Sequence, residues 1–409
     1  MKTKFLKLAI KNIARNKRRS AITAMIIVFG NVALILAGGF IKFTFWGLSE
    51  SSIRREYGHL QIFLPEALEK EEETPLQYGL SDADSLIQIL QTLEEVRFAM
   101  PRIGFMGLIS NGDKSVVFMG RAVIPEKEQK LSGFSVQMDE GHHLGEDVFA
   151  QDEDEVILAA GLAKSLGAEI GEYLTLMTTT TSGALNAIDV KVVGIFSTGI
   201  PEMDVRLLNV KLGTAQLLLN TNRVSNIVVV LKETKYTDLV AEKAAQLLDG
   251  FAIKKWYDLA AFYQAVVSLY TNIFTFLGAL IFVVVLLASS NTMMMSIFER
   301  TQEIGTLMAV GTSGKRLLSN FLLEGLALGV LAAAAGLLLG LLLSVVINHA
   351  GITMPPPPGS TRGYPLNVKY VTEIYVGTFI LMVITAVVST LFPAFKASRM
   401  KIVDALGHI

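Results

Sequence analysis

Four long stretches of the chain consist almost entirely of apolar residues. They lie at residues 21–46, 267–298, 317–348 and 374–395. Each could cross a bilayer core of about 30 Å as a helix, which needs about 20 residues. Only two charged residues interrupt them, Lys42 near the end of the first stretch and Glu324 in the third. The pattern predicts an α-helical membrane protein with four transmembrane helices.

The region between the first two spans has the alternating pattern of a mixed α+β domain. We assign this domain to residues 47–266 and expect it to form two lobes. Strands are predicted at residues 58–64, 116–119, 156–158, 173–177, 190–196 and 227–231, and helices at residues 82–96, 160–166 and 238–248. Residues 258–298 contain no proline and one glycine, so a single helix is expected to run from this domain through the second span.

Charge separates along the same boundaries. Of the 409 residues 51% are hydrophobic and the net charge is −1, but residues 47–266 carry 19 Lys and Arg against 32 Asp and Glu, a net charge of −13. The remainder has a net charge of +12, concentrated beside the spans. Because Lys and Arg resist translocation, both termini and the loop at residues 299–316 are expected in the cytoplasm. Residues 47–266 and the loop at residues 349–373 are then extracytoplasmic.

The smaller segments have patterns of their own. Residues 1–20 are basic with an apolar stripe, which predicts an uncleaved amphipathic helix on the inner membrane surface. Residues 396–409 form a short cytoplasmic tail. In the loop at residues 349–373, Pro355–Pro358 form stiff polyproline II, as a cover between two spans or as a ligand for a partner protein.

No motif supports catalysis, a cofactor or a metal in this chain. There are no cysteines, and the adjacent His142 and His143 cannot easily face one metal. The glycine-rich run from Gly311 to Arg316 lacks both the first glycine and the Ser or Thr of a P-loop, so ATP and Mg²⁺ are expected on a partner ATPase. The nearly balanced total charge gives no indication of nucleic-acid binding.

The third span contains the residues that we assign to membrane or dimer packing. Glu324 is an intramembrane carboxylate with either a structural pairing role or a proton or substrate role. Gly325 and Gly329, then Gly336 and Gly340, form two G-x-x-x-G patterns. Such patterns allow close helix approach, within one subunit or between two.

The loop at residues 299–316 contains a short amphipathic helix that ends at Gly311, with Ile304, Leu307 and Met308 on one face. Its sequence, Phe-Glu-Arg-Thr-Gln-Glu-Ile-Gly-Thr-Leu-Met-Ala-Val-Gly-Thr-Ser, resembles the E-R-x-x-E-I-G-x-L-x-A-x-G-A-S loop of the MacB/FtsX/Lol class of ABC transporter permeases. The order of spans and domain also resembles that class. The resemblance implies a coupling helix that contacts the ATPase through Glu299, Arg300, Glu303, Ile304, Gly305, Leu307, Met308 and Gly311.

A second segment resembles the lipoprotein-release permeases (LolC and LolE) more narrowly. It runs Val-Gly-Ile-Phe-Ser-Thr-Gly-Ile-Pro-Glu-Met-Asp and ends at Asp204. The resemblance implies candidate cargo or partner contacts at Gly199, Pro201, Glu202 and Asp204. It further implies an ATPase dimer, a second permease copy that is identical or different, and a periplasmic carrier or adaptor, in contact with lipid of the bacterial inner (cytoplasmic) membrane.

Three functions fit this resemblance. The leading hypothesis is a non-enzymatic permease subunit that couples ATP hydrolysis by its partner to movement of the periplasmic domains, extracting or exporting a hydrophobic cargo such as a lipoprotein or lipid. One alternative is MacB-like efflux of drugs, peptides or toxins with an adaptor. The other is FtsX-like transmembrane signalling to a cell-wall hydrolase. Four spans without clear internal repeats give little support to a secondary transporter.

Overall fold

A computed structural model describes residues 17–70, 73–132, 137–146, 154–355, 361, 363–402 and 405. The chain divides into two compact units. Met1–Trp46, Val266–Met354 and Pro365–Ile409 make up the helical unit, whereas Gly47–Ala265 and Pro355–Tyr364 make up the inserted domain. The predicted amphipathic helix at residues 1–20 and the Pro355–Pro358 run fall mostly outside the described residues.

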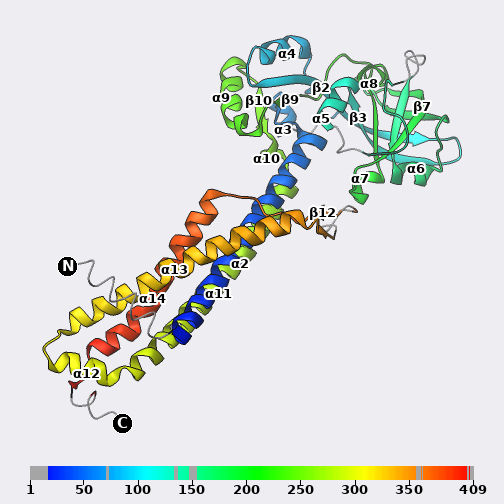
Figure 1. Ribbon diagram of the computed structural model, residues 1–409. Coiled ribbons are helices and arrows are strands. Elements are labelled where there is room, and N and C mark those ends of the chain that lie inside the picture. Colours follow the sequence, from blue (N-terminus) through cyan, green and yellow to red (C-terminus); the bar gives the residue numbers. More distant parts are fainter. Residues whose placement is uncertain are drawn as a thin grey trace. The chain divides into compact units, whose positions relative to one another are not determined.

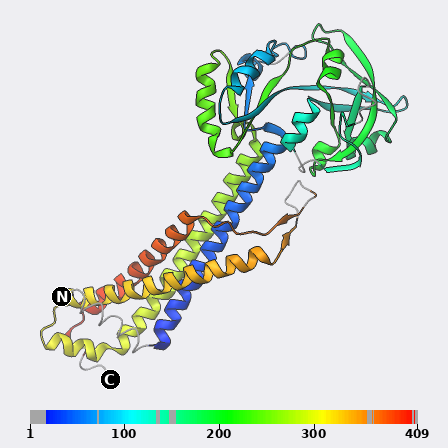
Figure 2. The same ribbon diagram turned by 45° about the horizontal axis from the view of Figure 1, so that its top comes forward.

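Among the described residues, four helices are long and apolar enough to cross a membrane. They are α2 (Lys17–Ser52), α11 (Ala261–Glu299), α13 (Gly314–His349) and α14 (Thr372–Ser398). Figures 1 and 2 show them side by side, and each contributes one of Ile27, Val285, Ala333 and Met382 to a shared buried cluster. The short α12 (Thr301–Ala309) joins α11 to α13. The prediction of four spanning helices is confirmed.

The glycines of α13 allow it to pack closely against its neighbours. An added Cβ would lie within 3.0 Å of a side chain of α14 at Gly325 and Gly329, and of α2 at Gly336 and Gly340. All four glycines are buried. These approaches are all within one chain, so the two G-x-x-x-G patterns serve helix packing inside the helical unit.

In the part of the inserted domain that the structure describes, ten strands form one sheet. In sheet order they run β10-β1-β9-β2-β3-β8-β5-β7-β4, with β6 paired to β2 and β7. The strands are β1 (Leu60–Phe63), β2 (Val96–Ser110), β3 (Ser115–Val123), β4 (Gln137–Gly141), β5 (Glu155–Ala159), β6 (Tyr173–Thr179), β7 (Leu185–Ser197), β8 (Leu207–Lys211), β9 (Asn226–Leu231) and β10 (Ala252–Lys255). Strand β2 pairs with β9 up to Arg102 and with β3 from Ile103 onward, so one long strand serves both halves of the domain.

Short helices cover this sheet. They are α3 (Glu66–Glu69), α4 (Ala83–Gln91), α5 (Pro125–Ser132), α6 (Ala160–Leu166), α7 (Pro201–Asp204), α8 (Leu212–Leu219), α9 (Thr237–Leu247) and α10 (Trp256–Leu259). A π-helical turn, Ile53–Tyr57, precedes β1, and a 3₁₀ turn, Thr234–Tyr236, precedes α9. Two-residue strands, β11 (Thr353–Met354) and β12 (Tyr364–Pro365), lie between α13 and α14.

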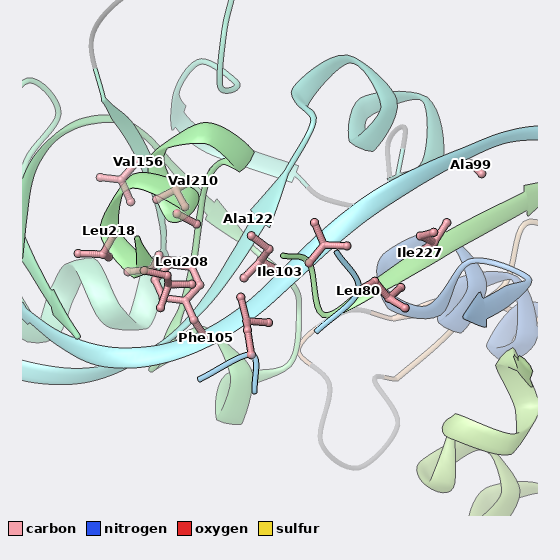
Figure 3. Close-up of a cluster of buried hydrophobic side chains, with 14 of the residues drawn as sticks. Leu80, Ala99, Ile103, Phe105, Ala122, Val156, Leu208, Val210, Leu218 and Ile227 are labelled. Carbon is pink, nitrogen blue, oxygen red and sulfur yellow. The ribbon is translucent and has the colours of Figure 1, made fainter. Parts of the chain in front are cut away.

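One hydrophobic core runs through the inserted domain. Figure 3 shows part of it, with Leu80 and Ile227 at one end, Ile103 and Phe105 of β2 in the middle, and Leu218 of α8 at the other end. Because β2 contributes residues along most of its length, the two halves share their buried surface. Separating the two halves would expose this apolar surface to water, at a free-energy cost of about 25 cal/mol per Å².

Two predicted elements differ from the structure. The helix predicted at residues 82–96 ends at Gln91, because Val96 already begins the unpredicted strand β2. Its start is as expected, since the Asp82 carboxylate accepts a hydrogen bond from the Ser85 amide. The single helix predicted from residue 258 is interrupted after Leu259, so that α11 begins at Ala261.

A buried histidine joins several elements of the inserted domain. His59 Nδ1 accepts a hydrogen bond from the Leu231 amide, its Nε2 lies 3.3 Å from the Thr234 hydroxyl, and that hydroxyl donates to Glu50. Burial lowers the pKa of His59 to about 4, with the positive charge of Arg54 acting in the same direction and the negative charge of Glu50 opposing it. His59 is therefore neutral in the folded domain at neutral pH.

We expect the inserted domain to lose stability as the pH falls from 6.5 to 4. In this window the unfolded chain protonates His59, whose ordinary pKa is about 6.5, and the folded domain does not. The loss amounts to as much as about 3 kcal/mol at pH 4. Fluorescence of the buried Trp256 in a Trp46→Phe background reports unfolding. His59→Gln should flatten the pH dependence in this window, and an unchanged pH dependence would contradict the assignment.

Candidate coupling site at the α12 end of the helical unit

Local hydrogen bonds define both ends of α12. At its start the Thr301 hydroxyl donates to the Phe298 carbonyl at 2.8 Å. At its end Gly311 has a φ of +97°, and the Thr312 amide donates to the Leu307 carbonyl at 3.0 Å. This is the glycine-terminated C-cap that a left-handed residue permits. Local residues thus determine both the length of α12 and its turn into α13.

One face of α12 is buried against the helical unit. Ile304 packs in a cluster that joins α11, α12, α13 and α14. Its buried partners are Ile297, Leu317, Phe321, Ala394 and Ala397. Thr301 and Gly305 are also buried. The inner face of α12 is therefore held by packing, and these residues cannot contact a partner without leaving the core.

Side chains beside this buried face are exposed. Leu307 is 50% exposed, with Glu303 one turn before it, and Val310, the C-cap residue that follows α12, is 83% exposed. The sequence pattern placed Ile304, Leu307 and Met308 on one contact face, but the structure divides them: Ile304 is buried, Met308 is half-buried and Leu307 faces outward. Val310 was missed, although its spacing of three from Leu307 could have indicated it.

Two charged side chains connect α12 to α13. Arg300 Nη1 lies 3.4 Å from Glu324 Oε1, and Arg300 Nε lies 3.4 Å from Glu303 Oε2. The Arg300 and Glu324 side chains are only 15% and 13% exposed, whereas Glu303 is 54% exposed. Glu324 thus has a structural ion-pair partner in Arg300, the N-cap residue immediately before α12. Glu299 is exposed at the end of α11.

Glu324 also borders a small cavity of the helical unit, which both polar and apolar side chains line. Its volume is about 40 Å³, enough for two or three water molecules. Its polar lining residues are Ser20, Thr23, Ser289, Thr292, Ser296, Glu324 and Thr390. The Glu324 carboxylate therefore contacts the Arg300 guanidinium and also borders a space that several hydroxyl side chains line.

The second predicted segment is a tightly bonded turn in the inserted domain. The buried Asp204 carboxylate accepts hydrogen bonds from the Thr198 amide and hydroxyl and from the Ser197 hydroxyl, at 2.6–3.0 Å. Gly199 is buried, whereas Pro201 and Glu202 are exposed at the start of α7. Asp204 holds the turn, and Pro201 and Glu202 are the positions that a ligand could reach.

Two further chain segments are bonded to the same turn. Arg55 Nη1 donates to the Thr198 carbonyl at 2.8 Å, and the Thr361 amide donates to the Gly199 carbonyl at 2.9 Å. No local pattern connects Arg55 with Thr198, because the two residues are 143 positions apart. Their contact follows from the fold of the sheet.

Other sequence-level candidates show no site. Among the residues that the structure describes, no group of three His, Asp or Glu side chains could hold a metal ion. His142 Nδ1 lies 3.0 Å from the carbonyl of its neighbour His143. Gly314 begins α13 close to the Ser398 carbonyl, so the glycine-rich turn is part of the helix packing.

Two family models together span most of the chain. The MacB-like periplasmic core domain matches residues 20–247, more than half of the sequence, and the FtsX-like permease C-terminal model matches residues 256–402. This chain belongs to the MacB/FtsX/Lol class of ABC transporter permeases. The second match contains α12 and the Arg300–Glu324 pair, so α12 lies in the part of the chain that matches the permease model.

Individual relatives of the permease have low sequence identity but align with much of this chain. An uncharacterised ABC transporter permease of Methanocaldococcus jannaschii is 25% identical over 97% of this chain and 96% of its own length. The lipoprotein-releasing system transmembrane protein LolC of Neisseria meningitidis is 24% identical, over 64% of this chain and 65% of its own. The pyoverdine export ATP-binding/permease protein PvdT of Pseudomonas putida is 25% identical, over 96% of this chain and 57% of its own.

Among solved structures, the periplasmic region of MacB from Actinobacillus actinomycetemcomitans is similar to this permease. It is 15% identical, covers 52% of this chain and 95% of that one, and has a TM-score of 0.35. Membership of the class makes the chain a multi-pass membrane protein and implies an ABC ATPase as its partner.

Proposed function

We propose that this permease couples ATP hydrolysis by a separate ABC ATPase dimer to movement of its inserted domain, and that it thereby extracts a hydrophobic cargo from the outer side of the inner membrane. In this proposal ATP and Mg²⁺ bind to the ATPase only. Two permease copies, identical or different, bind the ATPase dimer. A periplasmic carrier or adaptor receives the cargo.

The single observation that carries the proposal is the division of α12 into two faces. One face is packed in the helical unit through Ile304, whereas Leu307 beside it and the C-cap residue Val310 are exposed. An amphipathic helix that presents apolar side chains at this spacing is suited to a groove in a partner. Because the buried face of α12 is packed in the helical unit, a movement of the ATPase groove that holds α12 would also move α11 and α13.

The basic residues beside the spans support the orientation. Lys315 and Arg316 follow α12, and Lys396 and Arg399 lie at the end of α14. By the positive-inside rule we place α12 and both chain ends in the cytoplasm. The inserted domain is then on the opposite side, where an ATPase cannot reach it.

We favour a lipoprotein or lipid as the cargo. Relatives named for lipoprotein release include LolC of Neisseria meningitidis and of Xylella fastidiosa. Efflux is the second candidate, supported by the similarity to the pyoverdine exporter PvdT over 96% of this chain. Signalling to a cell-wall hydrolase is the other alternative. It would be favoured if a strain that lacks the permease accumulated no cargo.

The experiment is purification of the permease from its native membrane, with quantification of the bound ABC ATPase and of any lipidated protein. Replacing Leu307 and Val310 together with serine should lower the recovered ATPase at least tenfold, because buried apolar anchors each contribute about 1 kcal/mol or more. Undiminished ATPase binding would exclude this docking face. Lipidated protein in the wild-type complex favours extraction, and an adaptor with an outer-membrane duct favours efflux.

A matched control separates docking from folding. Leu217→Ser in the inserted domain removes a side chain of similar exposure, 66%, far from α12 in the sequence. It should leave ATPase recovery unchanged. Ile304 and Gly305 are unsuitable for this test because their replacement would disturb the packing of the helical unit itself.

A further inference from the structure

The outer face of the central strands of the inserted domain is apolar. Strands β2 and β3 place Met106 opposite Met119 and Leu108 opposite Val117, and these four side chains are 43–67% exposed. The next strand, β6, places Met177 beside Leu108. We call these five residues the methionine face. It lies entirely within one unit of the structure.

An apolar composition is unusual for the face of a sheet that points away from the core. Alternate residues of the same strands, such as Phe105, Ile109 and Phe118, fill the core from the other side. A sheet with one buried face normally carries polar side chains on the other. Here the apolar pairs are bordered by Ser110 and Ser115, and no charged side chain lies among them.

The dimensions of the face limit what can cover it. One row runs without interruption through Val117, Leu108, Met177 and Ala187 on four adjacent strands, a length of about 14 Å at 4.8 Å per strand. The exposed apolar area is a few hundred Å², less than the roughly 800 Å² per partner of a stable protein interface. The row matches instead the extent of one acyl chain, since a bilayer leaflet is about 15 Å thick.

The charges around the face differ from one corner to the other. Arg121 lies two residues beyond Met119 on the same side of β3, beside Arg102. Arg55, Arg102 and Arg121 are accompanied by the carboxylates of Glu56 and Glu128, an excess of one positive charge. At the diagonally opposite corner, Asp189 is paired with Thr175, and Lys191 lies two residues further on the same side of β7. An excess of positive charge is therefore present at the Arg121 corner and not at the Asp189 corner, which favours an anionic group beside Arg121.

We infer that the methionine face binds one acyl chain of an anionic lipid, with the head group at Arg121 and the chain running across the strands toward β7. Methionine side chains suit this ligand because they are unbranched and flexible, and can follow an irregular apolar shape. The inference rests on the proposed function, in which the inserted domain handles apolar cargo on the outer side of the membrane. It adds a binding surface on that domain.

The test uses the full-length permease in phosphatidylcholine nanodiscs and a 16-carbon fatty acid with a photoreactive diazirine at its methyl end. After irradiation, mass spectrometry of proteolytic fragments should locate the label on residues 173–187, at the β7 end of the face. Replacing Met106, Leu108, Val117 and Met119 together with threonine, which suits an exposed strand, should reduce this labelling at least tenfold. Arg121→Gln should reduce labelling by the fatty acid but not by the matching 16-carbon alcohol.

Controls keep the outcome decisive. Leu217→Gln with Leu239→Gln and Leu247→Gln removes exposed apolar side chains from α8 and α9 and should not change the labelling. Unchanged melting of the inserted domain shows that the threonine variant is folded. Labelling that survives in that variant, or that spreads over all exposed apolar residues, overturns the inference, as does a change of its oligomeric state, which would make the face a protein interface. ATPase recovery is independent of this face, so the Leu307 and Val310 test of the proposed function can fail or succeed separately.

Discussion

Replacement of Gly329 by leucine is expected to prevent the helical unit from assembling. A Cβ at this position would lie 2.6 Å from the Cβ of Ala386 on α14, so the new side chain has no space unless α13 and α14 separate. Both residues are buried, and overpacking of such a contact costs roughly 3 kcal/mol or more. Size-exclusion chromatography of the detergent-solubilised variant should show aggregated protein, with a lowered melting temperature for any monodisperse fraction.

Gly377→Leu on α14 is the matched control. This glycine has nothing within 4 Å of an added Cβ, and leucine favours a helix by about 1 kcal/mol relative to glycine. The control should therefore elute and melt as the wild type does, or slightly higher. If both variants behaved alike, the close contact of α13 with α14 would be refuted.

The spanning helices could be predicted from the sequence because their signal is long. Runs of more than 20 apolar residues are typical of membrane spans and rare in water-soluble domains, and the structure has a long apolar helix at each of these runs. Strand β2 could not be predicted in the same way. Pro101, Gly104 and Gly107 interrupt its pattern, and its stability comes from pairing with β9 and β3 rather than from local preference.

The coupling helix could be located from the sequence, but not its orientation. Periodicity shows that Ile304 and Leu307 share a broad apolar stripe, and it does not show which part of the stripe faces the protein's own core. Ile304 is buried because α14 supplies Ala394 and Ala397 from about 90 residues further along the chain. Long-range packing of this kind is absent from any local pattern.

The same reasoning applies to the Asp204 turn. Glycine, proline and acidic residues in sequence suggested a contact surface, whereas the structure uses Asp204 to hold Thr198 and Ser197. Of the four predicted contact residues, Pro201 and Glu202 are exposed, and Gly199 and Asp204 are buried. The turn is hydrogen-bonded to Arg55, which follows α2 in the sequence. A ligand bound at Pro201 and Glu202 would therefore contact a turn that is bonded to the segment after the first span.

Replacement of Glu324 by alanine is expected to lower the melting temperature of the permease and to weaken the response of α13 to events at α12. The change removes the buried partner of the largely buried Arg300 and leaves it only the more exposed Glu303. Removing one member of a buried pair costs about 3–5 kcal/mol, and the partial exposure of this pair reduces that to roughly 2 kcal/mol. Thermal unfolding measures the stability, and ATP hydrolysis by the assembled complex measures the coupling.

A double-mutant cycle isolates the contribution of this pair. Arg300→Ala and Glu324→Ala should each destabilise the protein, and the double variant should be less damaged than their sum predicts, because neither charge is then left alone. Glu303→Ala is the matched control: Glu303 lies at the same 3.4 Å from Arg300 but is 54% exposed, so its loss should cost less than about 0.5 kcal/mol. Additive effects in the cycle would show that the two side chains act independently. A non-additive result in both stability and ATP hydrolysis would identify the pair as the connection through which α12 acts on the third spanning helix.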